Sequence, residues 1–173
     1  MTAKLYTGID IGGTDIKAGL VTEQGRVVRT KTIPTRAAGG PGPVLERIAG
    51  LVREMEKEEN CKTAGVGIGV PGQVLVESGF LVDAPNLPGW KNTPLSKNLE
   101  ERLDRPVELD NDANAAGLAE HGFGAGKGCS HMLMVTLGTG VGGGLILNGE
   151  VFHGARGGAA EFGHIVIREG GET

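Results

Sequence analysis

The sequence predicts an α/β protein with one nearly complete structural unit and the beginning of a second, related unit. An apolar run over residues 5–11 stops at Gly12-Gly13, and a second apolar run follows at once over residues 16–21. This order is typical of two strands joined by a tight turn. The same order returns around glycines in residues 132–137 and 142–147. A repeated pattern of this kind indicates two copies of one supersecondary unit.

The other elements follow from apolar spacing and from turn residues. Helical spacing of apolar residues predicts three helices, at residues 43–59, around Leu95, Leu99 and Leu103, and from Asn111-Asp112 to about Glu120. A hairpin is possible between residues 73 and 92. Short apolar runs predict further strands at residues 26–33, 64–70, 106–109 and 161–167. The glycine-rich stretch 122–128 separates the two units.

The composition is that of an ordinary globular protein apart from its glycine content. Of the 173 residues, 32 are glycine, roughly 18% against a usual level of about 7%. The net charge is −4 without a basic block, which argues against a nucleic-acid partner. No apolar run approaches the ~20 residues of a membrane span. Cys61 and Cys129 indicate two free thiols, and the start of the chain lacks a secretory layout, so a cytoplasmic protein is expected.

The first glycine turn carries the sequence Asp10-Ile11-Gly12-Gly13-Thr14. Paired glycines between two strands let backbone N–H groups reach phosphate oxygens. Thr14 can add a hydroxyl donor, Lys17 can add positive charge, and Asp10 can offer a carboxylate oxygen to hydrated Mg²⁺. Standing alone, this motif is explained as well by a plain hairpin turn.

The second glycine turn makes the phosphate interpretation more specific. Residues 137–144 read LGTGVGGG, and their candidate phosphate-binding residues are Gly138, Thr139, Gly140, Gly142 and Gly143. Two similar turns at matching places in two related units predict a nucleotide in the cleft between the units.

Two other nucleotide motifs are disfavoured by their context. Residues 67–72 and 138–143 both fit the pattern GxGxxG, but the dinucleotide-binding fingerprint needs a helix directly after its glycines. Pro71 and the apolar run 143–147 argue against such a helix. Residues 122–127 lack the spacing and the Ser or Thr of a P-loop.

Polar residues gather at two further places. Residues 110–114, DNDAN, lie at an expected helix start, where a carboxylate can accept a hydroxyl proton during phosphoryl transfer. Helix capping explains one such residue but not four. Glu161 and His164 would face opposite sides of a strand but converge in a turn, where they suit recognition of a polyhydroxyl ligand. A histidine on its own is more often structural.

These four motifs, in this order over residues 5–167, resemble the ROK family of bacterial sugar kinases and repressors. The resemblance implies an actin/hexokinase-like fold, with RNase H-like lobes around a cleft. It implies that residues 8–15 and 138–145 bind the ATP phosphates and that Asp112 is the general base. The sugar-binding residues that it implies are Asn111, Asp112, Glu161 and His164, with Gly72 and Asn86 lining the pocket.

The reaction implied by the resemblance is ATP-dependent phosphorylation of a hexose at its 6-hydroxyl, with Mg²⁺ as a cofactor. The loop 83–90, DAPNLPGW, is most like that of the glucokinases, so glucose is the expected substrate. N-acetylglucosamine and N-acetylmannosamine are the alternative substrates. A sugar-binding protein without catalysis and an inactive fragment are the alternatives to a kinase. No membrane partner is expected, and a homodimer or homotetramer is expected for the full-length protein.

The resemblance also implies a zinc site that this chain does not complete. Family members continue past Glu-Phe-Gly-His into a cysteine cluster, which binds structural Zn²⁺ together with that histidine. Such a site needs four ligands, and at matching positions this chain offers only His164. We therefore expect an N-terminal RNase H-like lobe at residues 1–121 and a truncated second, nucleotide-binding lobe at residues 122–173.

Overall fold

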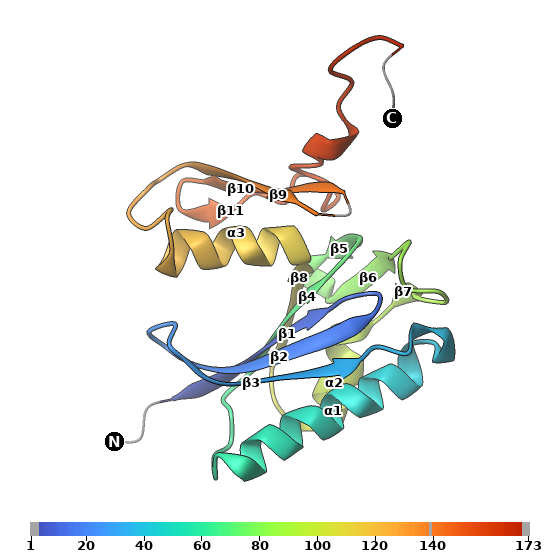
Figure 1. Ribbon diagram of the computed structural model, residues 1–173, viewed down its shortest axis with the longest axis vertical. Helices are drawn as coiled ribbons and strands as arrows, with labels where there is room; N and C mark the ends of the chain where they lie inside the picture. Colours follow the sequence, from blue (N-terminus) through green and yellow to red (C-terminus); the bar gives the residue numbers. More distant parts are fainter. Residues whose placement is uncertain (1–3, 139, 171–173) are drawn as a thin grey trace.

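The computed structural model describes residues 4–138 and 140–170 and has a five-stranded sheet at its centre (Figure 1). The strand order is β3-β2-β1-β4-β8. The antiparallel part consists of β1 (Leu5–Ile11), β2 (Asp15–Thr22) and β3 (Val27–Pro34). Two strands run parallel to β1 at the other side of the sheet, β4 (Val66–Val70) and β8 (Val107–Asn111).

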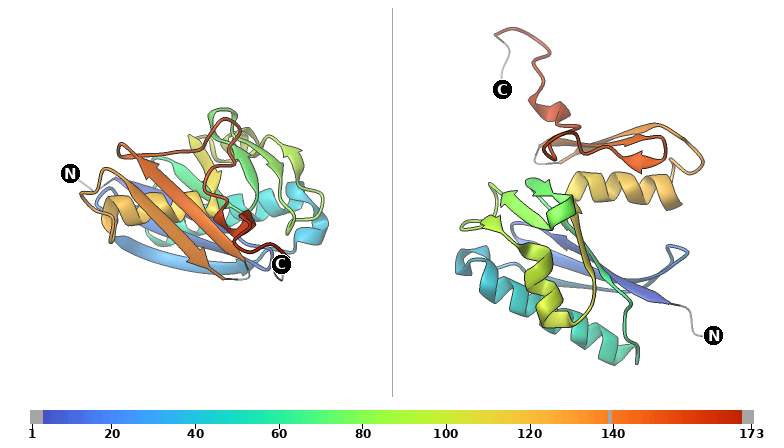
Figure 2. Two further views of the ribbon diagram at one scale, coloured as in Figure 1. Left: turned by 90° about the horizontal axis from the view of Figure 1, so that it is seen from above. Right: turned by 180° about the vertical axis from the view of Figure 1, so that it is seen from behind.

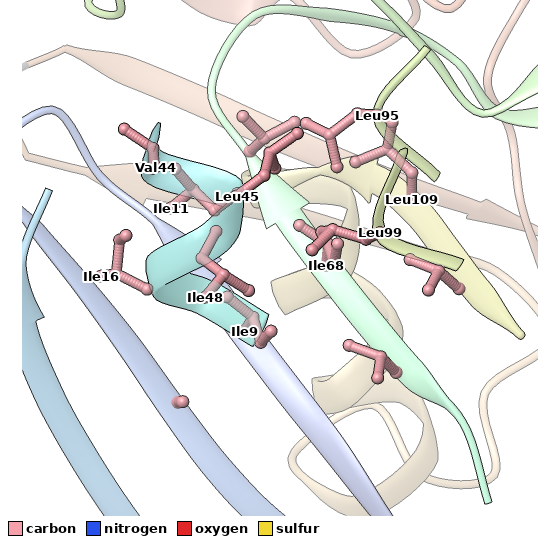
Figure 3. Close-up of a cluster of buried hydrophobic side chains, with 14 of the residues drawn as sticks. Ile9, Ile11, Ile16, Val44, Leu45, Ile48, Ile68, Leu95, Leu99 and Leu109 are labelled. Carbon is pink, nitrogen blue, oxygen red and sulfur yellow. The ribbon is translucent and has the colours of Figure 1, made fainter. Parts of the chain in front are cut away.

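Helices lie on both faces of the central sheet (Figures 1 and 2). One face is covered by α1 (Pro41–Glu58) and α2 (Leu95–Leu103), and the other carries α3 (Asp112–Phe123). The core lies on the α1 face, where Leu45 and Ile48 of α1 meet Ile9 and Ile11 of β1 (Figure 3). Burying each such side chain contributes about 1.5–3 kcal/mol, so this layer holds the sheet in place.

A small antiparallel sheet lies beside the central one. It consists of β5 (Gln73–Leu75), β6 (Phe80–Asp83) and β7 (Lys91–Thr93), in that order. The possible hairpin between residues 73 and 92 is thereby confirmed, with a third strand added. The loop between β6 and β7 carries Asn86 and ends at Trp90, whose side chain is buried in the core. The loop lies close to the end of β1, since a Cβ atom at Gly13 would lie 3.2 Å from the carbonyl oxygen of Asn86.

The third sheet lies on the far side of α3, so that α3 is sandwiched between two sheets (Figure 1). Its strands are β9 (Met132–Leu137), β10 (Val141–Leu147) and β11 (Glu150–Val151), in the order β11-β10-β9. Helix and strand approach closely at two glycines: a Cβ atom at Gly144 would lie 2.8 Å from the carbonyl oxygen of Ala113 and 3.3 Å from Cα of Gly117. Glycine at this crossing lets α3 and β10 pack backbone against backbone.

The strand expected at residues 161–167 is wrong. Phe162–His164 form a short 3₁₀ turn, and Ile165, Val166 and Ile167 are exposed. No strand within residues 4–138 and 140–170 pairs with this segment, and an unpaired strand leaves its backbone groups without partners. The three expected helices and the other expected strands are confirmed, with ends shifted by a few residues. None of the helices in the described residues combines the length and apolarity needed to cross a bilayer.

Candidate active site

A cleft of about 690 Å³ lies between one end of the central sheet and the β9–β10 hairpin. It brings together motifs that are far apart in the sequence. The residues predicted from the sequence that line it are Gly12, Gly13, Gly72, Asn86, Asn111, Asp112, Gly138, Gly140, Gly142, Gly143, Glu161 and His164. Both glycine turns and both polar motifs therefore face one space.

Sheet topology explains why these residues meet. β1, β4 and β8 are parallel neighbours, so their carboxyl ends lie at the same edge of the sheet. Each strand is followed directly by one lining motif: Gly12-Gly13 after β1, Pro71-Gly72 after β4, and Asn111-Asp112 at the β8–α3 junction. Ligands of open α/β sheets commonly bind at this edge.

Asn111 and Asp112 are held at the start of α3 by hydrogen bonds. The Asn111 side-chain oxygen accepts from the backbone N–H groups of Ala113 (2.9 Å) and Asn114 (3.3 Å), while its Nδ2 donates to the carbonyl of Gly72 (3.1 Å). Helix capping thus accounts for Asn111. Asp112 Oδ1 accepts from the Ala113 N–H at 2.9 Å. The positive end of the helix dipole stabilises a carboxylate in this first turn. Asp112 also borders the cleft.

The first glycine turn is fixed by Thr35, a residue that the sequence analysis missed. The Thr35 hydroxyl donates to the carbonyl of Gly12 (2.6 Å), and its backbone N–H donates to the carbonyl of Thr14 (2.7 Å). Arg47 of α1 in turn donates to the Thr35 carbonyl (2.9 Å). Thr35 is fully buried, so this turn is tied to the layer beneath the sheet. No short motif marks Thr35, because it belongs to the loop after β3 and meets the turn only in the folded chain.

Asp10, Thr14 and Lys17 are not among the residues that line the cleft. Asp10 and Lys17 are direct neighbours across β1 and β2, and their side chains alternate with the buried residues of these strands. Burial raises the pKa of Asp10 above its ordinary value, Lys17 opposes this rise, and the nearby Asp112 carboxylate adds to it. The phosphate and magnesium roles of these three residues remain predictions, and Thr139 lies outside the described residues.

Glu161 and His164 converge as the turn geometry requires. Glu161 Oε2 lies 3.9 Å from His164 Nε2 across the short 3₁₀ turn, and both exposed side chains border the cleft. Nothing near His164 completes a zinc site in the part of the chain that the structure describes, which holds no cluster of three His, Cys, Asp or Glu side chains fit for a metal ion. The residues present therefore do not fit structural zinc.

Four further polar or loop residues line the cleft without having been predicted as site residues: Gln73, Asp83, Pro85 and Thr136. Asp83 and Pro85 belong to the loop region 83–90, which the sequence analysis singled out for substrate preference. Thr136 is a polar residue inside the apolar run of β9, and that interruption is the signal that could have identified it. Gln73 carries no signal in the sequence.

The chain resembles known proteins over almost all of its length. A glucokinase of Halalkalibacterium halodurans is 43% identical over 175 residues, which cover 99% of this chain and 53% of that protein. A glucokinase of Thermotoga maritima is 42% identical over 164 residues, 95% of this chain and 51% of that protein. The chain therefore spans about half the length of these relatives.

A solved structure gives the same result. The crystal structure of a ROK family glucokinase from Streptomyces griseus in complex with glucose and AMPPNP superimposes with a TM-score of 0.85 at 39% identity, covering 95% of this chain and 51% of that one. The fold is thus the α/β fold of the actin/hexokinase-like proteins. The model of the ROK family matches residues 6–173, and the chain belongs to this family.

Proposed function

We propose that the protein carrying this chain transfers the γ-phosphoryl group of ATP to the 6-hydroxyl of a hexose, with glucose as the expected substrate. One observation carries the proposal: both glycine turns, the Asn111-Asp112 pair and the Glu161–His164 turn line a single cleft. The similarity to two glucokinases and to a structure with glucose and AMPPNP supports it. Because the chain spans about half of those proteins, the proposal concerns the complete protein.

Asp112 is the proposed general base. Its carboxylate would accept the proton of the sugar 6-hydroxyl while that oxygen attacks the γ-phosphorus in line. The new bond joins the 6-oxygen to phosphorus, the bond from phosphorus to the β–γ bridging oxygen breaks, and ADP leaves with that oxygen. Asn111, Glu161 and His164 would hold other sugar hydroxyls, because an amide, a carboxylate and an imidazole together offer donors and acceptors.

The two glycine turns are proposed to hold the ATP phosphates from opposite sides of the cleft. Their backbone N–H groups can approach phosphate oxygens because no side chain intervenes. Asp10 is the carboxylate that would hold Mg²⁺, which binds through one or two carboxylates plus substrate phosphates. Bound Mg²⁺ would neutralise developing phosphate charge. The division into lobes at residues 121 and 122, a cytoplasmic location and a homodimer or homotetramer remain part of this proposal.

The test is Asp112→Asn in the complete protein. Asparagine keeps the shape of the side chain but cannot accept the proton, so we expect kcat to fall about 10²–10⁴-fold while glucose still binds. A coupled assay of ADP release measures turnover, and calorimetry measures glucose binding. Asp104→Asn is the matched control, because Asp104 is exposed at the end of α2 in a left-handed conformation that asparagine tolerates. We expect its kinetics to equal those of the parent protein.

Undiminished turnover of Asp112→Asn would remove Asp112 from the role of base. A parent protein that binds sugar in the calorimeter but never an ATP analogue would instead support a sugar-binding protein without catalysis. The same assay with glucose, N-acetylglucosamine, N-acetylmannosamine, mannose and fructose ranks the hexoses by kcat/KM. Preference for an N-acetylated sugar would correct the expected substrate and leave the reaction class in place.

A further inference from the structure

The segment from His153 to His164 connects β11 with the turn that carries Glu161, and it touches the central unit at several points. His153 Nε2 lies 2.8 Å from Asp110 Oδ2. Gln73 of β5 donates from Nε2 to the carbonyl of Arg156 at 2.7 Å. Gly157 packs so closely on β5 that a Cβ atom there would collide with the carbonyl of Val74. The segment therefore rests on the central unit rather than only on its own sheet.

The Asp110 carboxylate is hydrogen-bonded both within the 110–114 motif and to the segment that leads to Glu161 and His164. It accepts three hydrogen bonds, from the backbone N–H of Asn111 (2.7 Å), from Asn114 Nδ2 (3.0 Å) and from His153 Nε2 (2.8 Å). A carboxylate only accepts, so the imidazole donates from Nε2. The side chains of His153 and Asp110 are 29% and 18% exposed, so this bond is partly shielded from water. Asp110 directly precedes the Asn111-Asp112 pair.

On the other side, His153 is linked to the turn that it precedes. Its carbonyl accepts from the backbone N–H of Ala159 at 3.1 Å, which closes the loop between them. The N–H of His164 donates to the carbonyl of Glu161 at 3.1 Å and forms the 3₁₀ turn. Asp110, two residues before the proposed base, is thus hydrogen-bonded to His153, and His153 is hydrogen-bonded to Ala159, two residues before Glu161.

We propose that His153 is a positioning residue, whose hydrogen bond to Asp110 fixes the Glu161–His164 turn relative to Asn111 and Asp112. The role rests on the proposed function, since it concerns the distance between the sugar-binding residues and the base. Loss of the bond frees the segment to shift and leaves one oxygen of Asp110 without its donor. A displacement of about 1 Å at a reacting centre can cost 10²-fold in rate. His153 itself would touch neither sugar nor nucleotide.

The kinetic test compares His153→Phe with His153→Gln in the complete protein. Phenylalanine keeps the ring but has no donor, whereas the glutamine amide can donate from nearly the same place. We expect kcat/KM for the hexose to fall about 10–100-fold in His153→Phe, with the KM for ATP unchanged, and to be restored within about threefold of the parent value in His153→Gln. His131→Phe is the control, because His131 is exposed and, among the described residues, accepts only from the N–H of Asn148.

A second measurement does not depend on activity. Amide hydrogen exchange should become faster at Ala159 and His164 in His153→Phe but not in His153→Gln or His131→Phe. Parental exchange in His153→Phe would overturn the proposal, and so would a glutamine variant as impaired as the phenylalanine variant. If the parent protein showed no turnover but His153→Phe still exchanged faster at these two amides, only the proposed function would be contradicted. The effect of the His153–Asp110 bond on the segment would still be demonstrated.

Discussion

The central sheet and the β9–β11 sheet border the same cleft but differ in what holds them. The central sheet shares one continuous apolar core with α1 and α2, and most of the fully buried side chains lie there (Figure 3). In the β9–β11 sheet only Ile146 among the described residues is a fully buried hydrophobic. The outer face of β9 instead exposes Leu133, Val135 and Leu137. The second sheet therefore depends mainly on its contact with α3.

This difference divides the cleft into two halves with different support. The half with Asn111, Asp112 and the first glycine turn is built on the packed sheet and is braced by buried Thr35. The half with the second glycine turn, Glu161 and His164 is held by the α3 contact and by the bonds of the 153–164 segment. We expect substitutions to lower global stability in the first half and to disturb site geometry in the second.

The largest effect is expected from Leu45→Ala in α1. Leu45 is 1% exposed in the core, and truncation of a buried leucine removes its packing and leaves a cavity. The free energy of unfolding should fall by about 2–5 kcal/mol, measured by urea denaturation. The same substitution at Leu133, which is 52% exposed on β9, should change it by no more than about 0.5 kcal/mol.

A loss of several kcal/mol from Leu133→Ala would contradict this comparison. It would mean that the outer face of β9 is covered in solution by something that the described residues do not include. Equal and small losses at both positions would mean that the α1 layer contributes less than its burial implies.

A second, smaller effect concerns the ion pair that ties α1 to the edge of the central sheet. Buried Glu56 accepts from Arg105 and from the backbone N–H (2.7 Å) and hydroxyl (2.8 Å) of Thr63. Burial raises the pKa of Glu56, but these hydrogen bonds lower the pKa by more. The pKa of Glu56 therefore lies below its ordinary value of 4.5. The stabilisation is present above pH 4.5 and is lost as the pH falls through the folded-state pKa.

Glu56→Gln should therefore cost about 1.5–3 kcal/mol at neutral pH, because a hydrogen-bonded charge is lost. The difference from the parent protein should shrink in denaturation curves recorded below pH 4.5. Glu46→Gln on the same helix is the control, since Glu46 is largely exposed and pairs with Arg102 at the surface. A difference that is constant across this range would show that the Glu56 carboxylate does not stabilise the fold through its charge.

Most of the central unit could be predicted from the sequence because its signals are local. The spacing of Val44, Leu45, Ile48 and Val52 defines one face of α1, and glycines mark the turn between β1 and β2. The strand expected at residues 161–167 failed for the opposite reason. Its apolar residues gave a local signal, but a strand also needs a neighbour to pair with, and sequence spacing does not reveal whether one is present.

The cleft could be predicted in part, since glycine turns and clustered polar residues are recognisable as motifs. That Gly12, Asp112 and Gly140 face one space depended on the parallel order of β1, β4 and β8, which the apolar runs alone did not give. Supporting residues were missed altogether. Thr35 bonds to Gly12 and Thr14, and His153 bonds to Asp110; such hydrogen bonds between distant parts of the chain leave no pattern in the sequence.

The second sheet depends on the close contact between β10 and α3. At Gly144 a Cβ atom would lie 2.8 Å from the carbonyl oxygen of Ala113, and the two methyl groups of valine would push β10 further from α3. Gly144→Val should lower the free energy of unfolding by about 1–3 kcal/mol. Because β10 carries one side of the second glycine turn, the same variant should bind an ATP analogue more weakly in calorimetry, while a core substitution of equal cost should not.

Gly122→Ala provides the matched control for this contact, since a Cβ atom at Gly122 meets nothing within 4 Å and the residue lies inside α3. Alanine there should leave nucleotide binding unchanged and should stabilise the protein by no more than about 0.5–1 kcal/mol, because Gly122 lies in the last turn of α3. If Gly144→Val lost stability but bound the analogue as the parent protein does, the second glycine turn would not need the α3–β10 contact for its position. The two halves of the cleft would then be supported independently, and the comparison between the two sheets would apply to stability alone.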